Sequence, residues 1–201
     1  MNALNSLTQE DLGSAAQRER RRRILDATIS LASHGGFDAV QMRAVAEQAD
    51  VALGTLYRYF PSKIHLLVSA LGREFEEAQA RRAGKPIPGD TPAERVGLIL
   101  GRTTKALQKD PNLTEALTRA FMFADASVSA EIHHVGLILT SMLTEAMSGR
   151  QDEGEPTEEE IAVARVIGDV WLSSLVGWVT GRSSAEDVEK SMTVAIRLLL
   201  R

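Results

Sequence analysis

Basic and hydroxyl side chains gather between residues 41 and 63 of this chain, in a stretch with few acids. Arg43 and Arg58 each carry a guanidinium fork that can read the O6 and N7 edges of guanine. Hydroxyl groups that can contact phosphate oxygens are offered by Thr55, Tyr57 and Tyr59. Lys63 stands at the start of a predicted helix, where a cation and free backbone N–H groups suit a phosphate. These residue types favour contact with a nucleic acid.

A second basic cluster lies upstream and is the densest charge run of the chain: Arg18, Arg20, Arg21, Arg22 and Arg23. Such a run is often only a solvated helix face. Early in a helix, however, consecutive arginines repel one another and oppose the helix dipole, which favours acids there. When a sequence breaks such a rule of helix stability and shows no compensating interaction, the residues often belong to a functional surface. We therefore expect these arginines to contact DNA phosphates or the minor groove.

No set of residues that would perform catalysis stands out. The chain has no cysteine, which excludes a thiolate nucleophile, a thiolate zinc site and a disulfide scaffold. His133 and His134 are adjacent, and neighbouring helical side chains point about 100° apart, so the pair cannot chelate one ion. We expect no enzyme activity, no metal site and no cofactor.

Apolar residues recur at helical spacing, as over Ile24–Leu31, and no segment alternates like a strand. This pattern predicts an all-α chain of about nine helices. Capping boxes that mark helix starts occur at Ser14–Gln17, Thr91–Glu94 and Thr157–Glu160, with a looser version at Ser184–Asp187. The predicted helices lie near residues 15–34, 42–49, 53–59, 62–83, 92–109, 112–124, 128–148, 158–180 and 185–200.

The predicted helices near 42–49 and 53–59 are unusually short. Isolated helices of this length are marginal in water, so they must pack on the first helix and on each other. A compact unit of three helices with short second and third members is the helix-turn-helix arrangement. Spacing alone is explained equally well by a loop region with two incidental helical turns.

Charge is unevenly divided along the chain, whose net charge is −4. Residues 14–66 hold eight basic against five acidic residues, and residues 67–201 hold fifteen against twenty. A slightly basic head on an acidic body can orient a protein on a polyanion. No uninterrupted apolar run approaches the ~18 residues of a membrane span, and the N-terminus is unlike a signal peptide. We expect a soluble cytoplasmic protein without a membrane partner.

Residues 41–63 resemble the TetR family of bacterial repressors. The family's pattern Val-x-x-Gly-Thr-Leu-Tyr-x-x-Phe-x-x-Lys is filled by Val51, Gly54, Thr55, Leu56, Tyr57, Phe60 and Lys63. The departures are Asp50, where the family commonly has glycine, and Leu53, which is often polar. The resemblance implies base-edge roles for Arg43, Leu53, Gly54 and Arg58, and DNA-backbone roles for Thr55, Tyr57, Tyr59 and Lys63. Periodicity alone would instead turn Leu53 and Tyr57 inward.

The resemblance also implies a domain plan and partners. Residues 1–14 would form a flexible arm, 15–66 the helix-turn-helix domain, and 67–201 a ligand-binding and dimerisation domain. Family members bind a palindromic double-stranded DNA operator as homodimers, and the subunit contact would use the eighth and ninth helices, near 158–180 and 185–200.

Further segments resemble the actinobacterial members of the family that repress cholesterol-catabolism genes: Ala16–Arg20, Val68–Phe75, Leu113–Ala116, Phe123–Ser127 and Asp169–Leu172. The resemblance implies a repressor of steroid catabolism that a steroid coenzyme A thioester releases from DNA.

Bulky apolar side chains beside methionines suit a large ring system, although residues at helical spacing are usually plain core. The candidate ligand contacts are Phe75, Phe121, Met122, Met142, Trp171 and Trp178, and the candidates for an anionic end are Arg102, Lys105, Arg119 and Arg165. Two alternatives stay open. The chain could be a TetR-type repressor that responds to another apolar ligand, such as a fatty acyl coenzyme A, or a helical ligand carrier that does not bind DNA.

Overall fold

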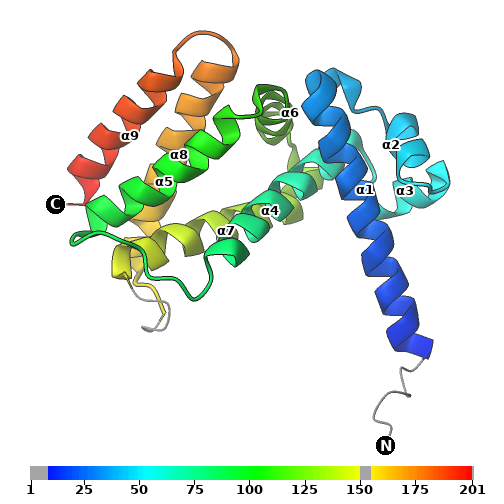
Figure 1. The fold of residues 1–201 in the computed structure, drawn as a ribbon, viewed down its shortest axis with the longest axis horizontal. Coiled ribbons are helices and arrows are strands. Elements are labelled where there is room, and N and C mark those ends of the chain that lie inside the picture. The colour runs from blue at the N-terminus through cyan, green and yellow to red at the C-terminus, as the bar shows by residue number, and fades with distance from the viewer. Residues whose placement is uncertain (1–8, 150–154, 201) are drawn as a thin grey trace, which may run out of the picture.

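The computed structural model describes residues 9–149 and 155–200, and this part of the chain is helical without a strand (Figure 1). Its helices are α1 (Gln9–Ala39), α2 (Met42–Gln48), α3 (Leu53–Tyr59), α4 (Lys63–Arg82), α5 (Pro92–Gln108), α6 (Pro111–Met122), α7 (Ser129–Ser148), α8 (Glu158–Val179) and α9 (Ala185–Leu199), with the short 3-10 helix η1 (Ala126–Val128) before α7. The all-α prediction of about nine helices is confirmed. We call α1–α3 the head and α4–α9 the body.

Three of the four predicted capping boxes lie at the start of a helix. The boxes that begin at Thr91, Thr157 and Ser184 form both of their reciprocal hydrogen bonds. The start predicted at Ser14 is wrong, because α1 begins at Gln9 and Ser14 lies inside it. The remainder of the predicted arm, residues 1–8, lies outside the described residues.

The head is held together by a small core that all three of its helices share. Ile24 and Leu25 of α1, Val45 of α2 and Leu56 of α3 are buried there with Phe60. Helices as short as α2 and α3 depend on such tertiary packing for their stability. The helix-turn-helix interpretation, which spacing alone left open, therefore describes the observed geometry.

The turn between α2 and α3 needs a left-handed backbone at Asp50, where φ is 52°. Aspartate tolerates this region better than most side chains, and glycine adopts it without a steric penalty. This geometry explains why a residue other than the family's common glycine can stand here. From α1, the Arg23 guanidinium donates to the Ala49 carbonyl at 2.8 Å, so a cation of the first helix closes the C-terminal end of α2.

The body surrounds a second core and presents α8 and α9 at the edge that lies farthest from the head (Figure 1). Helix α9 packs on α8 and α5, while α8 also packs on α6 and α7. Leu117, Leu143, Ile167 and Trp171 are buried between these helices. The Trp171 indole N–H donates to the Thr104 hydroxyl at 2.9 Å, which fixes α8 against α5.

The head and body meet at a joint between the end of α1 and α6. At Gly36 (φ 67°) the chain leaves the helical path of α1, and the next backbone N–H, that of Phe37, donates to the Glu115 carboxylate at 3.0 Å. The Arg119 guanidinium lies 4.3 Å from the centroid of the Phe37 ring. One turn before Glu115 in α6, the Asn112 side chain donates a hydrogen bond to a backbone carbonyl near the end of α1. Helix α6 is therefore fastened to the segment that leads into α2.

Helix α8 is the one helix within the described residues that is long and apolar enough to cross a membrane by length and composition. The sequence prediction missed it because Arg165 and Asp169 interrupt the apolar run. Only 28% of this stretch is buried within a single chain. Helix α8 packs on α6, α7 and α9, as a helix of the folded body does.

Substitutions at Asp50 test the turn between α2 and α3. We expect Asp50→Ala to lower the free energy of unfolding by about 1 kcal/mol, because alanine enters the left-handed region less readily. Asp50→Gly should leave the free energy of unfolding unchanged or raise it. Urea denaturation measures both, with the exposed helical substitution Gln48→Ala as control. Equal losses for alanine and glycine would mean that the weak ion pair of Asp50 with Arg23 (3.6 Å), and not the backbone, matters at this position.

Candidate nucleic-acid interface and ligand cavities

The outward face of α2 and α3 carries the residues that were predicted to read bases. Arg43, Gly54 and Arg58 are exposed, and no hydrogen bond or ion pair joins either arginine to another described residue. Tyr57 is 47% exposed, so it points outward as the family resemblance implies and not inward as periodicity alone suggests. Leu53 is half-buried and packs partly against the core.

No neighbour among the described residues requires a glycine at position 54. A Cβ atom placed on Gly54 would meet nothing within 4 Å. Glycine weakens a helix by roughly 0.5–1 kcal/mol relative to alanine, so a packing-neutral glycine here is a net cost to folding. Packing among the described residues therefore does not require a glycine at this position.

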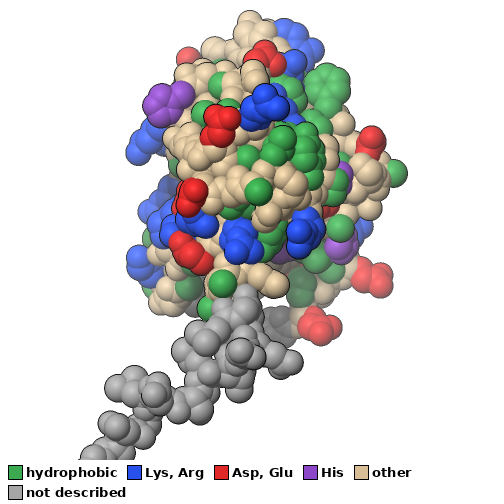
Figure 2. Space-filling model, turned by 90° about the vertical axis from the view of Figure 1, so that its right-hand side faces the viewer, with side chains coloured by type: hydrophobic (Ala, Val, Ile, Leu, Met, Phe, Trp, Pro, Cys, Tyr) green, Lys and Arg blue, Asp and Glu red, His purple; other side chains and the backbone are tan. Residues whose placement is uncertain are grey.

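Part of the arginine run joins α3 in a polar groove. Arg20 and Arg23 of α1 line this groove together with Thr55, Arg58 and Tyr59 of α3. Figure 2, which faces this side of the molecule, shows basic side chains spread over the surface among apolar and acidic ones. Several cations beside hydroxyl groups are the arrangement that a phosphate backbone requires.

Like Arg23, which donates to the Ala49 carbonyl, other arginines of the run have partners within the chain. The Arg22 guanidinium pairs with Glu19 at 2.6 Å and with Asp26 at 2.8 Å, and the hydrogen bond from Arg22 holds the pKa of Glu19 below its ordinary value. The Arg21 guanidinium lies 5.5 Å from the Phe60 ring centroid. Arg18 is exposed on the same helix. Acids one turn away thus supply the compensation for Arg22 that the run seemed to lack in the sequence.

Lys63 is placed at the joint between head and body. Its ammonium lies 3.8 Å from the centroid of the Phe37 ring, the ring that Arg119 also covers. Burial lowers the pKa of Lys63, and the neighbouring charge of Asp38 partly offsets this effect. A contact between Lys63 and a DNA phosphate would have to compete with this cation–π contact.

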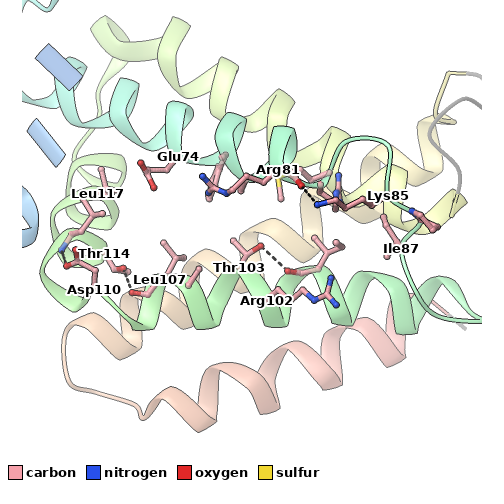
Figure 3. Close-up of a pocket in the computed structure, with 18 residues that line it drawn as sticks. Glu74, Arg81, Lys85, Ile87, Arg102, Thr103, Leu107, Asp110, Thr114 and Leu117 are labelled. Atoms are coloured by element: carbon pink, nitrogen blue, oxygen red, sulfur yellow. Dashed lines mark hydrogen bonds between the residues drawn. The ribbon is translucent and has the colours of Figure 1, made fainter. Parts of the chain in front are cut away.

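Two adjoining cavities lie in the body, and the larger of these two has a volume of about 390 Å³ between α4, α5, α6 and α7 (Figure 3). Its walls are mostly apolar, with Phe75, Ile99, Leu107 and Leu117 among the lining side chains. One end is basic, where α4 finishes and α5 passes: the lining residues there are Arg81, Arg82, Lys85 and Arg102. This combination suits a largely apolar ligand that carries an anionic group.

Arg82 is the member of the basic end that sequence reasoning missed. Glu145 of α7 binds its Nη2 atom at 2.5 Å, and Gln79 also donates to Glu145. The Nη1 atom of Arg82 is buried and has no hydrogen-bond partner among the described residues. In the sequence, Arg81 and Arg82 look like cations that favour the C-terminal end of any helix.

A smaller cavity of about 160 Å³ adjoins the larger one and is lined chiefly by α6, α7 and α8. Phe75, Leu107, Thr114 and Leu117 line both cavities and so form the wall between them. The ring of Phe75 stacks on that of Trp171 with centroids 6.1 Å apart.

Most predicted ligand contacts line one of these cavities. Phe75, Met142 and Arg102 line the larger cavity, and Phe121, Trp171 and Arg165 line the smaller one. Met122 and Trp178 line neither, and these two predictions are corrected: Met122 is 53% exposed at the end of α6, and Trp178 is half-buried near the end of α8. Lys105 is exposed on α5 and Arg119 belongs to the joint, so neither is at a cavity mouth.

Within residues 9–149 and 155–200, no three His, Asp or Glu side chains are placed to hold a metal ion. His134 instead hydrogen-bonds the Glu76 carboxylate at 2.7 Å.

The class of protein follows from this fold and from direct similarity. Residues 24–70 match the family described as "Bacterial regulatory proteins, tetR family", and residues 89–199 match "Tetracyclin repressor-like, C-terminal domain". The chain belongs to the TetR family of bacterial regulatory proteins.

Within that family the chain is similar to proteins named "HTH-type transcriptional repressor KstR". Identity is 60% with the one from Rhodococcus jostii, over 98% of this chain and 91% of that protein. It is 58% with the one from Mycolicibacterium smegmatis, over 96% of this chain and 93% of that protein. The crystal structure of a TetR transcriptional regulator from Rhodococcus sp. RHA1 is 31% identical with a TM-score of 0.83, covering 92% of this chain and 97% of that one.

Gly54→Ala separates folding from DNA contact. We expect the free energy of unfolding to stay the same or rise by up to ~1 kcal/mol, because alanine favours the helix and meets no neighbour. Affinity for DNA selected from a random pool should fall by about tenfold or more, because the added methyl group blocks close approach.

The control for this test is Gly101→Ala in α5, where a Cβ atom also meets nothing within 4 Å. Its affinity for the selected DNA should not change. Unchanged DNA affinity for Gly54→Ala as well would remove Gly54 from the interface.

Proposed function

We propose that this chain is a cytoplasmic, ligand-responsive repressor of steroid (cholesterol) catabolism genes, which binds a palindromic operator as a dimer and is released by a steroid coenzyme A thioester. The observation that carries the proposal is the identity of 58–60% with the KstR repressors, which extends through the body as well as the head. Similarity confined to the head would support only DNA binding.

On the DNA, Arg43, Gly54 and Arg58 would face base edges, with Leu53 beside them. Thr55, Tyr57 and Tyr59 would contact phosphates, together with Arg20 and Arg23 across the polar groove. Arg43 and Arg58 support this proposal because they are exposed and unpaired among the described residues. A ligand carrier without DNA activity gives no reason for this unpaired basic face.

In the body, the larger cavity would take the effector. A steroid acyl group would fill the apolar slot, while the anionic coenzyme A portion would lie at the basic end near Arg81, Lys85 and Arg102. Arg82 supports this orientation, because Glu145 fixes its guanidinium while Nη1 stays without a protein partner. Buried donors of this kind favour a ligand oxygen that satisfies them.

Dimerisation would use α8 and α9. Val166 of α8 and Val194 and Leu198 of α9 are large apolar residues that are 46%, 46% and 55% exposed. Two heads on a palindromic operator must reach major grooves ~34–36 Å apart, so the subunits need a fixed two-fold contact. The uncovered apolar surface of α8 supports this face as that contact.

Operator release tests the effector. Fluorescence anisotropy on the selected DNA should show release by the coenzyme A thioester of a cholesterol-derived acid, with about 5–150-fold weaker DNA binding at saturation. Free cholesterol and a straight-chain acyl coenzyme A should release much less. Arg82→Ala should need more of the steroid thioester, whereas Lys105→Ala, which removes a cation outside the cavity, should behave like the unmodified protein.

Stronger release by the straight-chain thioester than by the steroid thioester would favour the fatty acyl coenzyme A alternative. Absence of DNA binding in the selection would favour a ligand carrier.

Light scattering tests the subunit contact. The unmodified protein should have the mass of a dimer at micromolar concentration, and Leu198→Glu combined with Val194→Asp should be a monomer that binds the operator weakly. The control Phe123→Ser, which alters an apolar side chain that is 71% exposed at the end of α6, should remain a dimer. A monomeric mass for the unmodified protein would contradict dimerisation.

A further inference from the structure

The two ends of the larger cavity differ in charge. Figure 3 shows Arg81, Lys85 and Arg102 toward one end, and Glu74, from α4, toward the other, where Asp110 also lies. Glu74 and Arg81 are seven positions apart on α4, which is roughly 10 Å along the helix axis. A ligand that reaches from the basic end to Glu74 must be long, and a rigid ring system can span that distance.

Glu74 is a half-buried acid without a structural task. No hydrogen bond or ion pair joins it to any residue in the described part of the chain. Burial raises its pKa, and the negative charges of Glu77 and Asp110 add to this effect while the cations Arg73 and Arg81 oppose it. As a carboxylate Glu74 can accept a hydrogen bond from a ligand hydroxyl group, and in its protonated form it can also donate one to a ligand oxygen.

The neighbouring polar groups are already engaged. Asp110 accepts from the Leu113 backbone N–H at 2.9 Å and so caps α6. The Thr114 hydroxyl donates to the Leu107 carbonyl at 2.7 Å. Glu74 is therefore the side chain at this end whose hydrogen-bonding capacity is unused.

An unsatisfied polar group in a partly buried site costs free energy, and a ligand atom that pairs with it recovers that cost. An alkyl chain end offers no such atom. A site built to hydrogen-bond a ligand oxygen also discriminates against analogues that lack it, because the protein group is then left unpaired.

We propose that Glu74 is a specificity-determining residue that hydrogen-bonds a hydroxyl or keto oxygen on the end of the ligand opposite its anionic group. This inference rests on the proposed function and deepens it. The basic end of the cavity accepts any coenzyme A thioester, and Glu74 selects an oxygenated ring system over an alkyl chain.

The test compares two coenzyme A thioesters of one steroid acid, with and without an oxygen on the terminal ring. Their dissociation constants are measured by titration calorimetry on the unmodified protein, Glu74→Met and Glu74→Gln. The unmodified protein should prefer the oxygenated thioester by about tenfold. Glu74→Met should lose this preference because it gains affinity for the oxygen-free thioester, and Glu74→Gln, which keeps a donor and an acceptor, should retain most of it.

Glu76→Gln is the matched control, because Glu76 is exposed on the same helix and does not line the cavity. It should keep the full preference. Glu74→Ala is measured beside Glu74→Met, so the test does not depend on the folding of one variant.

The outcomes separate the two claims. A preference for the oxygenated thioester that survives in Glu74→Met and Glu74→Ala would overturn the role of Glu74 and leave the proposed function standing. Failure of both steroid thioesters to bind the unmodified protein would overturn the proposed function, and the role of Glu74 with it.

Discussion

The joint between the two halves of the molecule is centred on a hydrogen bond in which the Glu115 carboxylate accepts from the Phe37 backbone N–H at 3.0 Å, and Asn112 of α6 and Arg73 of α4 add further hydrogen bonds to α1. The approach is so close that a Cβ atom on Gly36 would lie 3.1 Å from Glu115 Oε2, which explains the glycine as well as its left-handed backbone. On its other side, α6 lines both cavities through Leu117. A ligand that shifts α6 must therefore move the head or break this joint.

A shift of α6 can be transmitted to the whole head because α2 and α3 are short helices. Because both helices depend on α1 for their core, they move with α1 as one unit. A repressor dimer needs only a change in the spacing of its two heads to lose a palindromic site. The ligand must bind the displaced arrangement more tightly, since equal affinity for both states would shift nothing.

Local chemistry made the helices predictable: a capping box such as that at Thr91 marks its own helix start. The outward direction of Tyr57 required the family pattern, because periodicity alone places it inside. Arg82 and Glu74 could not be found, since each looks like an ordinary solvated charge until neighbouring helices bury it. Met122 was predicted in the cavity because large apolar residues at helical spacing look alike, and only the packing of α6 against its neighbours distinguishes them.

The proposed mechanism couples the cavity to the DNA-binding head, and linkage gives the most direct measurement of this coupling. The dissociation constant of the steroid coenzyme A thioester is determined by titration calorimetry with and without saturating operator DNA. Coupling is reciprocal, so the operator should weaken thioester binding by the same factor by which the thioester weakens operator binding. Equal thioester affinity in the presence and absence of operator would contradict coupling between the cavity and the head.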